Sequence, residues 1–171
     1  MTLRTSIKRK TKLLRRLDHL ANRWLAGMKS PLLDRTIVPL GHAADRSRLW
    51  MVISLLLAAF GGRRSRRGAL RGMMSIGATS AIVNMGLKRI ARRKRPSGKL
   101  IRTRFGRLPT SSSFPSGHAA SAAAYAAGVA QEIPMAGIPM GALATGVAAS
   151  RVYAGVHYPA DVIVGAALGT G

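Results

Sequence analysis

The sequence contains no cysteine and only 5 acidic residues among 171. Without thiols there can be no disulfide, no thiolate nucleophile and no Cys-type zinc site. The shortage of Asp and Glu leaves 28 Lys and Arg largely unbalanced, with a formal net charge of +23. A soluble basic protein rarely combines such a charge with 47% hydrophobic residues, so basic and apolar residues must be segregated along this single-domain chain.

No apolar stretch follows the charged N-terminus, so we expect no secretory signal there. Residues 2–30 instead have the spacing of an amphipathic helix with a basic face and a Leu/Trp face. This pattern is typical of a helix that lies on an anionic membrane surface. A solvated helix packed on a core and a nucleic-acid-binding arm are the alternatives, since a basic tract does not distinguish phosphodiesters from lipid headgroups.

Further along, apolar segments predict the helices of a membrane protein. The segment 49–60 is short for a span of ~20 residues, so we expect its helix to begin earlier, near Ala43, and to end at Gly61–Gly62. The final segment is also short. The other predicted helices occupy 69–87, 117–131, 134–150 and 160–171.

Small residues recur at helical spacing in these segments, which allows close approach of helix backbones in lipid. The fold class we predict is all-α: an integral membrane helical bundle of roughly four to five spans with an N-terminal amphipathic surface helix. We assign 1–40 to the basic amphipathic segment and 41–171 to the membrane-embedded domain. A soluble helical bundle is the alternative, and the charge disfavours it. The small residues are Ala119, Ala123, Ala127, Gly137, Gly141, Gly165 and Gly169.

Three polar clusters interrupt the apolar segments, at residues 88–96, 115–118 and 150–161. One predicted helix ends in the first cluster and the next begins at the second, so both lie on one side of the bundle. Two further crossings return the chain to the third. The helix order therefore predicts that all three clusters meet at one face.

This face combines groups that suit a phosphate. Lys88, Arg95 and Arg151 supply positive charge, and the arginines also supply forked donors. Ser116 offers a hydroxyl, and the amide of Gly117 lies at a helix N-terminus. We prefer Ser116 as a phosphate donor to Ser116 as a nucleophile, because it is not in a Gly-x-Ser-x-Gly turn. The same donors could stabilise the equatorial oxygens of a phosphoryl transition state.

Two histidines and one aspartate could perform phosphoryl transfer. His157 can attack phosphorus and form a phosphohistidine, while Asp161 holds its other ring N–H. His118 can protonate the departing alkoxide and then deprotonate the hydrolytic water. Taken singly, each histidine is better explained as a hydrogen-bonding residue at a helix end or as a headgroup contact. Together and among three cations, they favour catalysis.

A metal ion is less suited to this face. His157 and Asp161 are four residues apart, as a ligand pair could be. A divalent cation would nevertheless meet three positive side chains and a single carboxylate. We therefore expect no metal and no cofactor.

The three clusters have the patterns Lys-x6-Arg-Pro, Pro-Ser-Gly-His and Ser-Arg-x5-His-x3-Asp. This ordered set resembles the type 2 phosphatidic acid phosphatase (PAP2) superfamily. The resemblance implies a metal-independent phosphohistidine mechanism with the roles given above. Vanadate-dependent haloperoxidases share the pattern but are larger soluble proteins, so the apolar helices favour the lipid phosphate phosphatase branch. Members of that branch usually carry six spans, and this chain is shorter.

The expected substrate is a phosphomonoester or pyrophosphate with an apolar tail in the bilayer. The chain is similar to small actinobacterial members of the superfamily assigned to dephosphorylation of decaprenylphosphoryl-5-phosphoribose in arabinan and cell-wall precursor synthesis. A polyprenyl pyrophosphate, phosphatidic acid and phosphatidylglycerol phosphate are alternative substrates. A non-catalytic basic membrane-binding protein is the alternative of another class. The expected partners are the lipid bilayer and a lipid phosphate, with no nucleic acid. A second anionic group of the substrate, or an anionic lipid, could contact Lys99, Arg102, Arg104 and Arg107.

Basic residues also bear on orientation in a plasma (inner) membrane. If 49–60 spans, the catalytic face carries 12 basic residues from 1–48, 10 from 88–107 and Arg151, against 5 on the opposite face. The positive-inside rule then places the catalytic face in the cytoplasm. If 49–60 is re-entrant, the opposite face carries 17 basic residues against 11, and the rule no longer favours the catalytic face.

Overall fold

The computed structural model describes residues 3–96 and 110–171, and all regular structure in these ranges is helical, as predicted. Three short turns join the longer helices: the 3-10 turn η1 (Asp45–Ser47), the π-helical η2 (Ile82–Leu87) and the 3-10 turn η3 (Pro134–Ala136). The α-helices are α1 (Leu3–Gly27), α2 (Pro31–Ala43), α3 (Arg48–Phe60), α4 (Arg63–Ala81), α5 (Lys88–Ala91), α7 (Gly117–Glu132), α8 (Gly137–Tyr153) and α9 (Pro159–Thr170).

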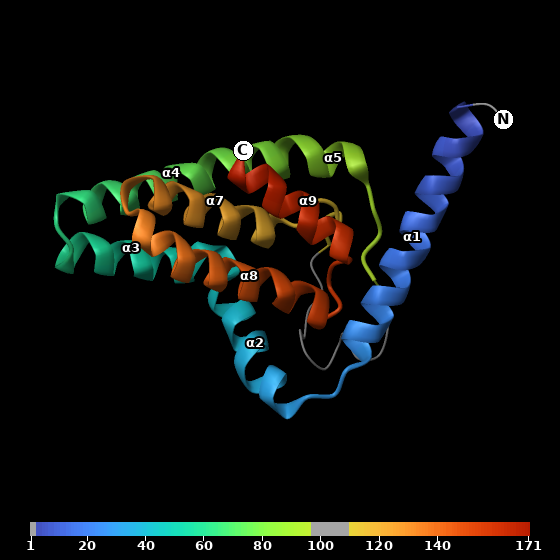
Figure 1. The fold of residues 1–171 in the computed structure, drawn as a ribbon, viewed down its shortest axis with the longest axis horizontal. Coiled ribbons are helices and arrows are strands. Elements are labelled where there is room, and N and C mark those ends of the chain that lie inside the picture. Colours follow the sequence, from blue (N-terminus) through green and yellow to red (C-terminus); the bar gives the residue numbers. More distant parts are fainter. Residues whose placement is uncertain (1–2, 97–109) are drawn as a thin grey trace.

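Helix α7 lies at the centre of a bundle and contacts α4, α8 and α9, while α3 packs beside α4 (Figure 1). The core beneath α7 is aromatic and aliphatic: the rings of Trp50 and Tyr125 lie 4.9 Å apart, next to Val129 and Val147. The hydroxyl of Tyr125 is 2.8 Å from Ser54 Oγ, so this buried polar atom is paired. Helices α1 and α2 lie at the end of the bundle where α8 ends and α9 begins (Figure 1).

Small residues allow the backbones to approach closely, in part where the sequence predicts it. A Cβ built on Gly165 would lie 2.5 Å from the Ser116 carbonyl oxygen, and one on Gly169 would lie 2.2 Å from that of Ala120. Gly141 has open space around it, so its predicted role in packing is wrong. The tightest crossing of α4 and α7 instead uses Gly128, whose Cβ would lie 2.9 Å from the Cα of Gly72.

Replacing Gly165 with Ala should destabilise the junction of α7 and α9, because the added methyl meets backbone that cannot rotate away. We expect a loss of about 1–3 kcal/mol in the free energy of unfolding. Gly141→Ala is the matched control, since both changes gain the helix propensity of Ala and only one meets a neighbour. Thermal unfolding in detergent measures the difference. Equal midpoints for the two variants would contradict this packing.

Two predicted boundaries are wrong at the start of the bundle. The first apolar helix begins at Arg48 and not near Ala43, because Arg46 (φ 52°) and Ser47 (φ 61°) break the chain after the unpredicted helix α2. Helix α4 begins at Arg63, six residues before the predicted start at 69, so its first turn is strongly basic. The other predicted helices are present, with ends shifted by up to three residues.

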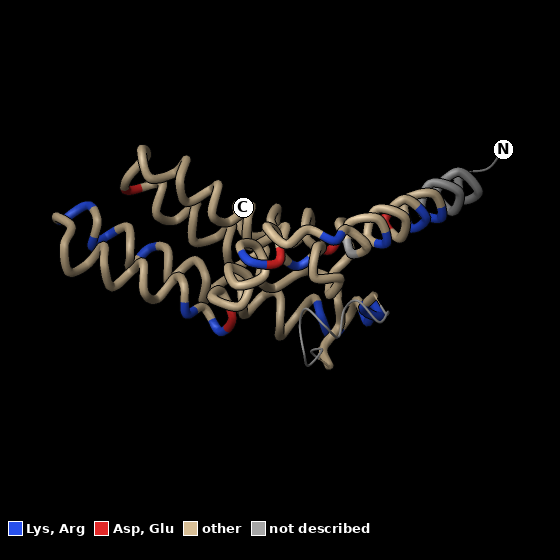
Figure 2. Tube along the Cα trace, turned by 90° about the horizontal axis from the view of Figure 1, so that it is seen from below, with Lys and Arg blue, Asp and Glu red and all other residues tan. Residues whose placement is uncertain are grey.

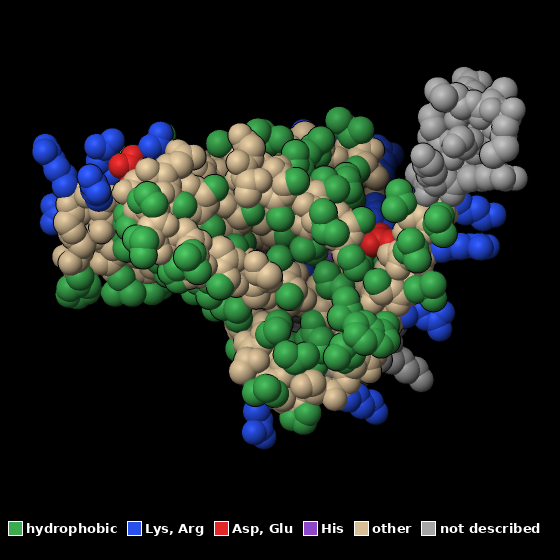
Figure 3. Space-filling model, viewed as in Figure 1, with side chains coloured by type: hydrophobic (Ala, Val, Ile, Leu, Met, Phe, Trp, Pro, Cys, Tyr) green, Lys and Arg blue, Asp and Glu red, His purple; other side chains and the backbone are tan. Residues whose placement is uncertain are grey.

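Within the two described ranges, no helix is both long enough and apolar enough to cross a membrane. Lys and Arg lie along α1, at the end of the bundle where α3 meets α4 and at the end nearer α1 (Figure 2). Helices α7 and α9 contain none. In the space-filling view, hydrophobic side chains cover much of the visible bundle, while basic side chains project from both ends (Figure 3).

Candidate active site

The three polar clusters meet at one end of the bundle, as the helix order predicts. Lys88 begins α5, Ser116 caps α7, and Arg151 lies in the last turn of α8. His157 lies in the connection between α8 and α9, and Asp161 lies in the first turn of α9. All except Lys88 are buried.

His157 is held between a cation and a carboxylate. Its Nε2 lies 3.1 Å from Nη1 of Arg95, and its Nδ1 lies 3.6 Å from Oδ2 of Asp161. Because a guanidinium only donates, Nε2 must present its lone pair, and the ring proton is on Nδ1 facing Asp161. This tautomer leaves Nε2 as the nucleophilic nitrogen.

Burial and, to a smaller extent, the charge of Arg95 lower the pKa of His157 to about 4, against the opposing effect of Asp161. The imidazole is therefore neutral at pH 7. Arg95 is itself fixed by the backbone: its guanidinium donates to the carbonyls of Val156, Ser111 and Ser112. The cation beside Nε2 of His157 is thus anchored near that nitrogen by three backbone carbonyls.

Asp161 joins two helices. Its Oδ2 accepts from the Tyr158 amide at 2.9 Å, and its backbone carbonyl accepts from the Ser116 amide at 2.9 Å. The nucleophile segment is therefore tied to the start of α7, where the second cluster lies. The side chain of Asp161 is fully buried.

The start of α7 brings three predicted phosphate-binding residues together. The Ser116 hydroxyl oxygen accepts from the Ala119 amide at 3.4 Å as a helix cap, and its own O–H remains able to donate. A Cβ built on Gly117 would lie 3.3 Å from Nζ of Lys88, so glycine leaves room for the ammonium beside the helix N-terminus. Burial lowers the pKa of Lys88, and nearby Arg95 lowers it further.

His118 and Arg151 share a partner that the sequence analysis missed. Asp45, in η1, accepts from His118 Nε2 at 2.8 Å and lies 3.5 Å from Nη1 of Arg151. Burial tends to raise the pKa of Asp45, but the hydrogen bond and charge of His118, with Arg151, lower it to about 2. A carboxylate therefore occupies the position between these two donors.

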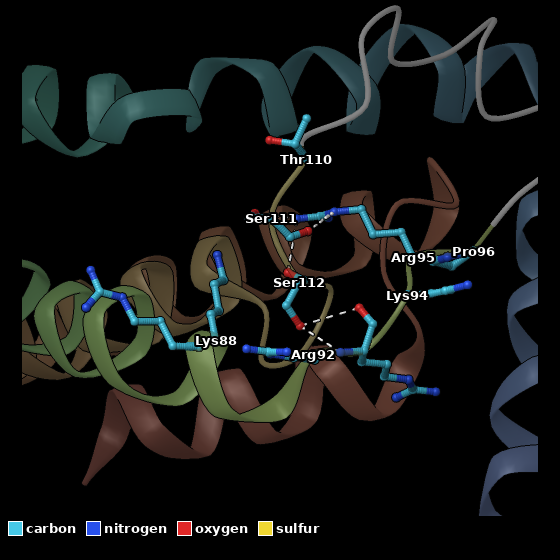
Figure 4. Close-up of a pocket in the computed structure, with 10 residues that line it drawn as sticks. Lys88, Arg92, Lys94, Arg95, Pro96, Thr110, Ser111 and Ser112 are labelled. Atoms are coloured by element: carbon cyan, nitrogen blue, oxygen red, sulfur yellow. Dashed lines mark hydrogen bonds between the residues drawn. The ribbon is translucent and has the colours of Figure 1, made fainter.

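Lys88 and Arg95 also line a cavity of about 780 Å³ beside the nucleophile (Figure 4). Its wall carries further cations, Arg89, Arg92 and Lys94. Arg95 reaches across to Ser111 in this view, and Lys88 projects from the opposite wall. A second cavity, of about 350 Å³, lies on the His118 side and is lined by Lys88, Gly117 and His118. The site thus opens on both sides of Lys88.

The structure brings four residues that the motifs did not indicate into contact with the predicted site: Asp18, Asn22, Asp45 and Arg93. The aspartates could have been noticed from composition, since a chain of charge +23 has only 5 acidic residues. Arg93 stands in a run of basic residues and had no distinguishing signal. No group of three His, Asp or Glu residues in the described ranges could hold a metal. The basic residues Lys99, Arg102, Arg104 and Arg107 lie outside the described residues.

Comparison with known proteins shows similarity to one family. The family model of the PAP2 superfamily matches residues 69–171. Decaprenylphosphoryl-5-phosphoribose phosphatase of Mycobacterium tuberculosis is 36% identical over 152 residues, covering 85% of this chain and 82% of that protein. The protein of that name from Mycolicibacterium smegmatis is 35% identical over 130 residues, covering 74% and 67%.

Two solved structures share the fold. A transmembrane PAP2-type phosphatidylglycerolphosphate phosphatase of Bacillus subtilis matches 92% of this chain and 81% of its own, with a TM-score of 0.70 and 24% identity. LpxE of Aquifex aeolicus matches 87% of both chains, with a TM-score of 0.68 and 25% identity.

Proposed function

The chain belongs to the PAP2 superfamily of phosphatases, and from that premise we propose that it hydrolyses a lipid-linked phosphomonoester through a phosphohistidine at His157. The observation that carries the proposal is the placement of His157. Arg95 orients its Nε2 lone pair and Asp161 faces its Nδ1. The neutral imidazole in this tautomer can attack phosphorus once the Arg95 guanidinium turns from Nε2 to the incoming phosphate.

The substrate phosphate binds where Asp45 now bridges His118 and Arg151. A carboxylate and a phosphate are both oxyanions and compete for the same donors. Once Asp45 is displaced, Lys88, Arg95 and Arg151 surround the phosphate, with Ser116 and the Gly117 amide as further donors. These groups stabilise the charge that spreads over the equatorial oxygens in the transition state.

The reaction then has two steps. Nε2 of His157 forms a bond to phosphorus while the ester P–O bond breaks. His118, as the imidazolium that a neighbouring phosphate dianion favours, gives its Nε2 proton to the leaving alkoxide and becomes neutral. Asp161 stabilises the positive charge that develops on the His157 ring. Water then attacks phosphorus and the N–P bond breaks. His118 takes the proton from that water, so the products are the lipid alcohol and inorganic phosphate.

The substrate that we propose is decaprenylphosphoryl-5-phosphoribose. Support comes from two relatives that are named decaprenylphosphoryl-5-phosphoribose phosphatase. They are 35–36% identical to this chain and align with most of it. The substrate carries a phosphodiester in addition to the phosphomonoester, and the cationic cavity beside the nucleophile suits a second anionic group.

We also propose that the protein is bound to the membrane. Exposed hydrophobic side chains on α3, including Leu55, Leu56 and Phe60, suit contact with lipid. On α1, Leu17 and Trp24 are exposed beside a basic face, which suits an anionic bilayer surface. Helix α3 leads away from the catalytic end, since Arg46 and Ser47 line the His118 cavity and Gly61–Gly62 begins the return. With α3 running in this direction, residues 1–48 lie on the catalytic side, which then carries more basic residues than the opposite side. The positive-inside rule therefore favours a cytoplasmic catalytic face.

Phosphate release by the purified protein, assayed in detergent with EDTA across a panel of lipid phosphates, tests the function. Decaprenylphosphoryl-5-phosphoribose should give the highest kcat/KM, and chelation should leave that rate unchanged because no step uses a metal. The panel includes phosphatidic acid, phosphatidylglycerol phosphate and a polyprenyl pyrophosphate. Activity that disappears with EDTA and returns with Mg²⁺ would contradict the mechanism. A preference for another lipid would contradict only the substrate.

A further inference from the structure

Helix α1 contacts the nucleophile segment directly. The side-chain amide of Asn22 donates to the His157 carbonyl at 2.9 Å, and Oδ1 of Asp18 accepts from the Ala160 amide at 2.9 Å. These two residues are one helical turn apart and therefore share a face. They are 5% and 8% exposed on a helix whose described side chains are otherwise mostly exposed. Leu25 continues this face and packs against Val152 and Val162.

Arg93 links the same helix to the catalytic carboxylate. Its Nη2 lies 2.5 Å from Oδ2 of Asp18, and its Nη1 lies 2.7 Å from Oδ1 of Asp161. The guanidinium also lies 4.0 Å from the centre of the Tyr158 ring. One forked cation thus bridges two buried carboxylates, an arrangement that a lysine cannot reproduce.

These contacts fix the orientation of the catalytic pair. Arg93 engages Oδ1 of Asp161, which leaves Oδ2 to face the Tyr158 amide and Nδ1 of His157. The His157 backbone is held from both sides, because its amide donates to the Arg151 carbonyl and its carbonyl accepts from Asn22. Loss of a contact to α1 would let the imidazole turn away from the line of attack.

We infer that Asp18, Asn22 and Arg93 are positioning residues for the His157–Asp161 pair, so that α1 is part of the catalytic unit as well as a surface helix. This inference rests on the proposed function of His157. Helix α1 lies outside the stretch matched by the family model, which begins at residue 69. The amphipathic sequence of α1 predicts contact with lipid. The buried polar face of α1, with Asp18 and Asn22, performs the second role of positioning the His157–Asp161 pair.

Rapid-quench measurements test the inference. The probe is decaprenylphosphoryl-5-phosphoribose labelled with ³²P at the ribose 5-phosphate, in detergent micelles. Asp18→Asn keeps the shape and an acceptor oxygen for Ala160 but loses the charge that holds Arg93. We expect phosphohistidine formation and kcat to fall roughly 10²-fold, since small misplacements of a reacting group cost that much. KM should stay within about twofold, because the phosphate-binding groups are untouched.

Three further variants complete the design. Asn22→Ala removes one hydrogen bond and no charge, so it provides a milder test if Asp18→Asn folds poorly. Arg93→Lys should lower the rate of phosphohistidine formation as Asp18→Asn does, because lysine keeps the charge but cannot bridge both carboxylates. Arg16→Gln, on the exposed side of α1, is the matched control and should match wild type.

The results separate a positioning role from a merely structural one. Rates are normalised to the folded fraction, measured by thermal unfolding. Wild-type rates per folded molecule in both Asp18→Asn and Asn22→Ala would overturn the inference while leaving the proposed function intact. Failure of the wild-type protein to form any phosphohistidine would instead overturn the proposed function.

Discussion

Replacement of His157 by Gln is expected to abolish phosphate release, with a loss on the order of 10⁴-fold or more in kcat. Glutamine is similar in length and can still accept from Arg95, so the pocket should remain filled. It has no nitrogen lone pair that can attack phosphorus, and no group that Asp161 could stabilise as a cation. The loss therefore reports the missing nucleophile.

Covalent trapping distinguishes this variant from one at the other histidine. After a rapid quench with labelled substrate, wild type should carry an acid-labile, alkali-stable phosphoryl group, and His157→Gln should carry none. His118→Gln should still form it, slowly, and also hydrolyse it slowly, because the general acid and base is lost from both steps. Label found on another residue in the wild-type protein would contradict the assignment of His157.

Replacement of Arg151 should produce the second largest loss. Arg151 is 1% exposed, and its guanidinium lies between Ser150 and Asp45, in the site that we propose for the substrate phosphate. Arg151→Lys keeps the charge and loses the forked donors, so we expect kcat/KM to fall roughly 10²-fold. Arg151→Gln also loses the charge and should fall roughly 10³-fold, as for other arginines that stabilise phosphoryl transfer. Steady-state kinetics on the labelled substrate measure both.

The control for these arginine variants is Arg64→Lys, at the exposed start of α4 far from the site, which should match wild type. The position of Arg151 can also be tested without changing it. A Cβ built on Gly41 would lie 2.2 Å from Nη2 of Arg151, so Gly41→Val should displace the guanidinium and reproduce much of the loss. Full activity in both single variants, Arg151→Lys and Gly41→Val, would show that the forked donors of Arg151 are not needed.

Asp45 shows why the anion site could not be completed from motifs. The sequence places it before an apolar helix, with no spacing that relates it to His118, 73 residues later. In the folded chain, the left-handed residues Arg46 and Ser47 turn η1 back over the start of α7. The carboxylate then meets His118 and Arg151. Only that backbone reversal brings the two segments together.

The packing of small residues was likewise only partly predictable from the sequence. Sequence spacing correctly indicates Gly165 and Gly169 as points of close approach, and wrongly includes Gly141. The periodicity of a helix specifies which residues share a face, but the face that meets a neighbour depends on how the helices pack. The crossing of Gly72 with Gly128 depends on two helices whose contact the sequence does not state.

The sequence by itself determined the helical class and the residues of the three motifs, as well as their meeting at one end of the bundle. These follow from local periodicity and from counting helices, so they need no long-range information. The tertiary structure alone decided which atoms face one another: Arg95 on Nε2 of His157, Asp45 between His118 and Arg151, and the buried face of α1 against residues 157–161. Those contacts join residues 62 to 142 positions apart. They are set by the way the helices pack on α7, and no local pattern in the sequence records that packing.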